Sequence, residues 1–261
     1  MSAGTFYKTF SSADRTTTRT LLHENIPITG ALVSGTYAIA TPTRDESVKT
    51  FSHGMFQSAY DYPFLSSSAN HLFDITYGFS TAPTSMSGAA RAAGDPTVAK
   101  KVNVYNQMAQ VLVGYDTTGS IRRFDVDGDL SGGAAHDSVF FLNFSRLLVK
   151  DEIKKGSFSF TLATGSAHGD GHRTTDEDLV ITDAGAATSY KVNSPAGEYG
   201  LLKDRGVNVG LLYYQAGIAV LTSSVMGLEG RNVQHANSQR PQCLLESYNG
   251  TIVQAMTGAG D

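Results

Sequence analysis

The segment Asp125-Val-Asp-Gly-Asp129 places three carboxylates at alternate positions. Asp125, Asp127 and Asp129 could surround a hard cation, because Ca²⁺ prefers carboxylate oxygens. A calcium loop of the EF-hand type needs glycine at its sixth position and glutamate at its twelfth. Counted from Asp125, these positions hold Leu130 and His136. The pattern therefore favours a turn on Asp127-Gly128 with solvated carboxylates, and a metal site is the weaker alternative.

A second group of potential ligands lies between residues 166 and 178. His168 and His172 stand among four acidic residues, and zinc could use both histidines with one carboxylate. The surrounding glycines and the lack of a rigid element favour a loop without a metal.

Motifs for catalysis or cofactor binding are missing from the sequence. It contains no Gly-x-Ser-x-Gly nucleophile turn, and its glycine-rich stretches lack the lysine of a phosphate-binding loop. His53 and His71 lie in a block rich in aromatic residues, where a structural histidine is the common case. We therefore predict no catalytic residue, no cofactor and no enzymatic activity.

Composition excludes several other classes of protein. A net charge of −4 argues against nucleic acid as a partner. Cys243, the single cysteine, excludes an intramolecular disulfide and a cysteine-cluster zinc site, and we expect a buried thiol. The longest apolar stretch, 211–221, is about half a membrane span. We therefore expect a soluble chain with no self-encoded export and no membrane partner.

One long helix is predicted near 97–113. Apolar residues recur there at spacings of four and three, from Val98 to Leu112. Asp95-Pro96 provides a start and Gly114 a stop. Lys101 is assigned to the polar face.

The remaining elements read mainly as strands, with two short helical pieces. Alternation or continuous apolar character predicts strands at 73–77, 137–144 and 157–162. Hairpins are expected from 178–182 with 189–192, and from 207–214 with 218–222. Helical turns are expected around 55–60 and within 145–155, the latter ending at Gly156.

These elements predict a mainly β (α+β) protein, an antiparallel sandwich or barrel-like domain with one main helix and long loops. The core domain is placed at 51–225. An extended N-terminal segment, 1–50, packs on it, and an irregular C-terminal segment occupies 226–261. The long loops at 80–95 and 163–176 are expected to become ordered on a partner.

Four blocks of sequence carry a resemblance to a known family, and they are Phe51–Asn70, Val102–Gln110, Phe140–Gly156 and Gly210–Leu221. They resemble virion structural proteins of tailed bacteriophages, notably marine and cyanobacterial ones, and the resemblance covers about 50–222. It implies a structural subunit of the virion, assembled in the host cytoplasm. It transfers no catalytic residue.

The resemblance implies a tail or baseplate position and partners that are other virion proteins and copies of this chain. Alternatives are a head, neck or capsid-surface protein, or a virion-associated receptor-binding, carbohydrate-binding or hydrolytic module. Aromatic residues suit such contacts, and the interface candidates are Phe51, Tyr60, Tyr62, Phe64 and Tyr213. The edge of the 207–222 hairpin is a further candidate.

Overall fold

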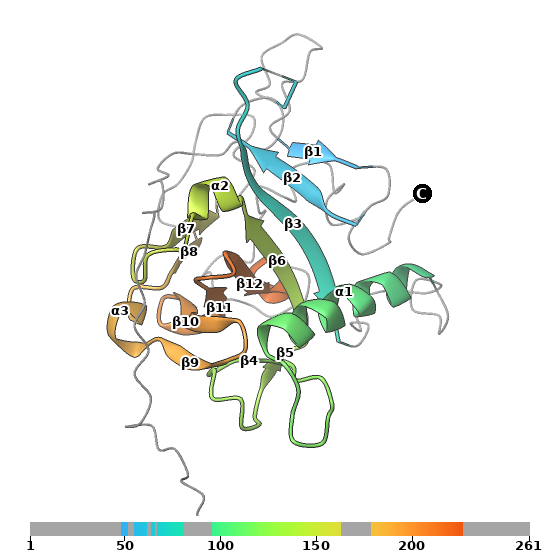
Figure 1. Ribbon diagram of the computed structural model, residues 1–261, viewed down its shortest axis with the longest axis vertical. Helices are drawn as coiled ribbons and strands as arrows, with labels where there is room; N and C mark the ends of the chain where they lie inside the picture. The colour runs from blue at the N-terminus through green and yellow to red at the C-terminus, as the bar shows by residue number, and fades with distance from the viewer. Residues whose placement is uncertain are drawn as a thin grey trace, which may run out of the picture.

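The computed structural model describes residues 48–51, 55–61, 64–65, 67–80, 96–162 and 179–226. Within these residues, a ten-stranded antiparallel sheet curls around one of its faces, and a long helix lies against the other (Figure 1). The mainly β class, with a barrel-like antiparallel sheet and one main helix, is confirmed.

The sheet follows the order β1-β2-β3-β6-β12-β11-β10-β8-β7, with β9 beside β10. A separate two-stranded ribbon joins β4 to β5. The strands are β1 (Val48–Thr50), β2 (Gln57–Tyr60), β3 (His71–Phe79), β4 (Phe124–Asp125), β5 (Ala135–His136), β6 (Ser138–Phe144), β7 (Ser159–Leu162), β8 (Leu179–Thr182), β9 (Lys191–Ser194), β10 (Gly197–Asp204), β11 (Val207–Tyr213) and β12 (Ile218–Thr222). The helices are α1 (Pro96–Leu112), α2 (Arg146–Val149), α3 (Ala186–Ser189) and the 3₁₀ turn η4 (Ser223–Met226).

The central strands are buried on both faces. In β6, Phe140 and Leu142 belong to the cluster inside the curl, whereas Val139 and Phe141 belong to a second cluster beneath α1 and the β4–β5 ribbon. Strands buried on both faces read as continuous apolar runs, which explains why 137–144 was predicted correctly as a buried strand.

Helix α1 begins and ends within one residue of its predicted bounds. The assignment of Lys101 to its polar face is wrong, because this side chain is 1% exposed. Lys101, Tyr105, Ala109 and Leu112 follow one another at spacings of four, four and three and form the buried stripe. The aliphatic stem of a lysine can pack within such a stripe.

Gly78 lets α1 approach the sheet closely. A Cβ atom at this position of β3 would lie 2.9 Å from the backbone nitrogen of Tyr105 and 3.2 Å from the carbonyl oxygen of Lys101. The absence of a side chain at Gly78 therefore sets the distance between helix and sheet.

Strand β2 corrects the expected helical turns around 55–60. Gln57, Ser58 and Ala59 are all buried and pair with Ile75, Asp74 and Phe73 of β3. Pairing with a strand that follows in the chain overrides the local pattern, which fits neither helix nor strand throughout.

The hairpin expected between 178–182 and 189–192 is also wrong. Strands β8 and β9 each pair with β10 rather than with each other, and α3 separates them. The β11–β12 hairpin is confirmed. It lies between β10 and β6, however, so neither of its strands offers the free edge proposed as a contact surface.

Helix α2 is shorter than predicted. It ends at Val149, and Lys150 follows with a φ of 58°, in the left-handed region that usually favours glycine. The stop therefore falls at Lys150 rather than at Gly156. The following strand, β7, is confirmed. Its Phe160 and the preceding Phe158 pack against the cluster inside the curl.

Candidate functional site

The loop between β4 and β5 brings the three predicted carboxylates together. One oxygen each from Asp125, Asp127 and Asp129 lies within 4.8 Å of the others. Asp125 is buried and the other two are exposed. The predicted turn is present, and Gly128 adopts a φ of +70° within it.

Backbone N–H groups already occupy these carboxylates. Asp125 Oδ2 accepts hydrogen bonds from the nitrogens of Asp129 (3.0 Å) and Leu130 (2.8 Å), and Asp129 Oδ1 accepts one from Ser131 (2.7 Å). Burial raises the pKa of Asp125, whereas the Ser131 hydrogen bond lowers that of Asp129. The loop can present oxygen ligands to a cation, but its hydrogen bonds close the turn without one.

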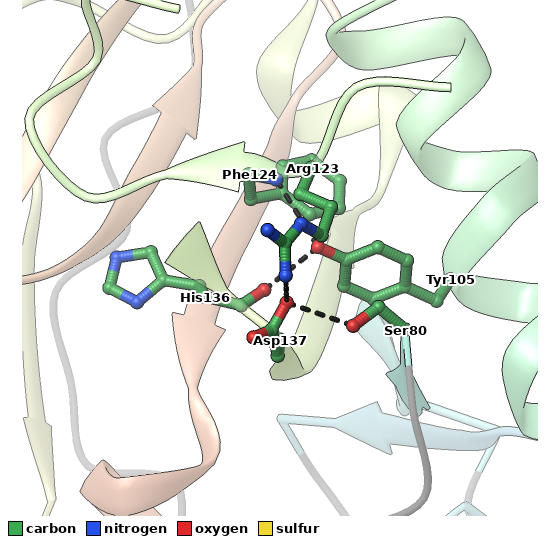
Figure 2. Close-up of polar contacts among 6 residues, drawn as sticks. All are labelled: Ser80, Tyr105, Arg123, Phe124, His136 and Asp137. Atoms are coloured by element: carbon green, nitrogen blue, oxygen red, sulfur yellow. Dashed lines mark hydrogen bonds and ion pairs between the residues drawn. The ribbon is translucent and has the colours of Figure 1, made fainter. Parts of the chain in front are cut away.

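A polar network joins the end of β3 and the middle of α1 to the β4–β5 ribbon (Figure 2). Asp137 accepts a hydrogen bond from Ser80 and forms an ion pair with Arg123, both at 2.8 Å. The Tyr105 hydroxyl donates to the His136 carbonyl at 2.8 Å and accepts from the nitrogen of Phe124 at 3.2 Å. Every contact links different elements, so this network is structural.

The His136 ring is the buried titratable group beside this network. It is 6% exposed, and its Nε2 has no hydrogen-bond partner among the described residues. Burial lowers the pKa of His136 to about 4, which keeps the imidazole neutral in the folded protein at neutral pH. Figure 2 shows the ring directed away from Arg123 and Asp137.

Three of the predicted interface residues gather at the β1–β2 end of the sheet. We call Lys49, Phe51, Tyr60 and Phe64 the edge patch. The Lys49 ammonium lies 5.0 Å from the centroid of the Phe51 ring and 5.9 Å from that of Phe64, and the rings of Tyr60 and Phe64 are 6.4 Å apart. All four side chains are half-buried.

The edge patch adjoins the most exposed large apolar side chain of the described residues. Leu65 follows Phe64 directly in the chain and is 88% exposed. The partly exposed aromatic rings are of the kind enriched at protein-binding surfaces, and the exposed Leu65 adds apolar area beside them.

Serine, histidine and aspartate also meet near this patch, on β2 and β3. Ser58 Oγ donates to Asp74 Oδ1, and the same oxygen lies 2.9 Å from Nε2 of His71. The aspartate stands between the other two residues, so the serine has no histidine base in this arrangement. The group is therefore a structural hydrogen-bond cluster that spans two strands.

Tyr213 does not join the other interface candidates. Its side chain is fully buried and stacks on Tyr199 with ring centroids 5.0 Å apart. Its position in the centre of the sheet makes it a core residue of the folded chain, which corrects the proposed contact role.

A buried carboxylate links segments that the sequence analysis left unconnected. Asp183 is fully buried and accepts hydrogen bonds from the nitrogens of Gly156 (2.8 Å) and Phe158 (2.9 Å) and from the Tyr214 hydroxyl (3.0 Å). Lys155 lies beside this group, 2.7 Å from a carboxylate oxygen of Glu198. In the sequence, the only indication of this role is that Asp183 directly follows the strand predicted at 178–182.

Several predicted features lie outside the described residues. They are Tyr62, His53, His168, His172, Cys243, the loops 80–95 and 163–176 (of which only Ser80 is described), the N-terminal segment before residue 48 and the C-terminal segment after 226.

Comparisons of the chain with protein-family models, with curated proteins and with solved structures return no match. Among the described residues, no helix has the length and apolar character needed to cross a membrane.

Proposed function

We propose that the chain is a structural subunit of a bacteriophage virion, in the tail or baseplate, and that it acts through protein–protein contacts. The observation that carries the proposal is the edge patch with its neighbour Leu65. The sequence predicts Phe51, Tyr60 and Phe64 as contact residues, and these side chains lie together at the β1–β2 border of the sheet. The resemblance of four sequence blocks to phage virion proteins supports the same role.

The physical character of the sheet suits such a subunit. Its central strands are buried on both faces, and this gives a stiff framework that can hold a contact surface in place. Repeated contacts in a particle generate high avidity from modest individual interfaces, so a small patch suffices.

Mass spectrometry of purified particles, separated into heads and tails, tests the location. We expect the protein in the tail fraction at a fixed ratio to other tail proteins. Detection in heads alone would move the proposal to a head protein, and absence from mature particles would overturn it.

Two variants test the contact surface in the phage itself. Leu65→Glu places a charge beside the edge patch and should reduce incorporation of the protein into particles. Val192→Glu is the matched control, because Val192 is also exposed (70%) but lies on β9, in another part of the sheet. Equal incorporation of both variants would contradict a contact at the edge patch.

A further inference from the structure

Strand β7 is the last strand of the sheet formed by the described residues. It pairs with β8 from Ser159↔Thr182 to Leu162↔Leu179, and no described strand pairs with its other side. A free strand edge offers backbone donors and acceptors to another strand, and proteins usually protect it with charges, proline or a bulge. The four residues of β7, Ser-Phe-Thr-Leu, include neither a charge nor a proline, and its register with β8 is continuous.

The direction of the backbone groups of β7 follows from its pairing. The carbonyl of Phe158 accepts a hydrogen bond from the nitrogen of Asp183, so this pair is hydrogen-bonded. Such pairs alternate along an antiparallel ladder, so Phe160 bonds to β8. Ser159 and Thr161 then direct their N–H and C=O groups away from β8, toward the free border.

We infer that β7 pairs with β7 of a second copy of this chain, antiparallel and about a two-fold axis. Centring the axis at Phe160 places Ser159 opposite the partner's Thr161, and the outward groups of these two residues form hydrogen bonds. Phe160 then faces the partner's Phe160, and aromatic cross-strand pairs of this kind stabilise sheets. The ten-stranded sheet would continue into the second copy.

Charge distinguishes this edge from the other two free borders of the described sheet. A two-fold pairing of β1 would place its central residue, Lys49, opposite the same lysine. Strand β9 carries Lys191, and its Asn193 amide donates to carbonyls of the β4–β5 loop, which holds the three aspartates. Pairing two copies through β9 would therefore bring two loops of the same negative charge toward each other. Strand β7 brings no charge to its copy.

Strand direction argues against joining β7 of one copy to β1 of the next. Nine strands lie along the antiparallel path, so its first and last strands run the same way. Copies arranged around a ring axis would therefore pair these edges in parallel, which is slightly less stable per residue. Two-fold dimers are also the commonest closed assemblies.

Light scattering coupled to size-exclusion chromatography of the full chain tests the inference. We expect twice the chain mass of 27.7 kDa at high protein concentration. Thr161→Pro removes one outward donor and should give a monomer, whereas Thr161→Ala keeps the donor and should remain dimeric. Far-UV circular dichroism identifies a variant that has lost its fold.

A second variant keeps the experiment decisive if proline unfolds the chain. Thr161→Lys leaves the backbone donor in place but brings positive charges close together across the axis. It should be monomeric at low ionic strength and dimeric at high salt, because salt screens exposed charges.

A wild-type monomer at every concentration, a dimer unaffected by both variants, or a larger closed ring would overturn the inference. The location of the protein in phage particles is tested separately, so failure here leaves the proposed virion role standing.

Discussion

Lys101 shows how a single buried charge influences stability at the residue scale. It lies in the buried stripe of α1, and burial lowers its pKa from 10.5 to about 8. The unfolded chain therefore binds more protons than the folded one between these values. The fold gains stability as pH rises through this range and loses it as pH falls.

We predict that the free energy of unfolding increases between pH 8 and 9.5. Lys101→Met keeps the aliphatic stem and should remove this increase, because it has no titrating group. Urea denaturation at several pH values measures both. The same slope in the variant would contradict the assignment. Lys203→Met, at an exposed position of β10, is the control.

His136 gives a second pH dependence, in the acidic range. Its folded pKa of about 4 lies below the ordinary value of 6.5, so the neutral form is the stable one in the fold. Stability is present above pH 6.5 and falls as pH drops toward 4, by roughly 2–3 kcal/mol. His136→Phe should flatten this part of the curve in urea denaturation. An unchanged acid limb would show that other groups cause it.

At the scale of elements, the contact between α1 and β3 depends on Gly78. Gly78→Ala would force a Cβ against the Tyr105 backbone at 2.9 Å, and the helix must shift. We expect a loss of about 1–3 kcal/mol in thermal or urea unfolding. Gly185→Ala is the control, because its Cβ would meet only Ser189 Oγ at 3.5 Å. Equal effects at both sites would contradict this account.

The acidic loop between β4 and β5 is an element that forms through its own hydrogen bonds. We therefore predict that a chelator leaves the melting temperature unchanged and that Ca²⁺ gives no stoichiometric heat in calorimetry. Asp125→Ala should cost about 1–2 kcal/mol, since buried Asp125 accepts two backbone N–H groups, and Asp127→Ala should cost less. A chelator-induced fall in melting temperature would favour a bound cation instead.

Elements with a strong local pattern were predictable from the sequence. The stripe from Val98 to Leu112 specifies α1, and the apolar runs of β6, β11 and β12 specify buried strands. Strand β2 and the separate pairing of β8 and β9 with β10 were not, because each depends on which other strand the segment pairs with. Local patterns carry no information about such pairings.

In the candidate site, too, some features could be predicted from the sequence and others could not. The spacing of Asp125, Asp127 and Asp129 predicts their proximity, and the density of aromatic residues predicts the edge patch. Asp183 and Lys101 look like ordinary polar residues in the sequence, because burial is a property of the assembled sheet. The predicted contact role of Tyr213 is wrong for the same reason, because its burial follows from its place in the sheet.

At the scale of the whole molecule, Asp183 ties the segment after α2 and strand β7 to Tyr214 in the centre of the sheet. Asp183→Ala leaves two backbone N–H groups and the Tyr214 hydroxyl without their acceptor. We expect a loss of at least about 2–3 kcal/mol in urea unfolding.

Asp137→Ala is the control for this variant. It removes an exposed carboxylate, 49% exposed, whose ion pair with Arg123 contributes about 1 kcal/mol or less. If removal of Asp183 cost no more than removal of Asp137, the linking role would be refuted.

The strand order also determines how long β6 lacks one of its partner strands during synthesis on the ribosome. Strand β6 is flanked in the sheet by β3 and β12, and Asn143 pairs with Ile218, about 75 residues later in the chain. At a translation rate of roughly 5–20 residues per second, its most apolar stretch waits about 4–15 seconds for that neighbour. During this interval the nascent chain exposes an adhesive surface, so its yield in the cell depends on how well chaperones shield it.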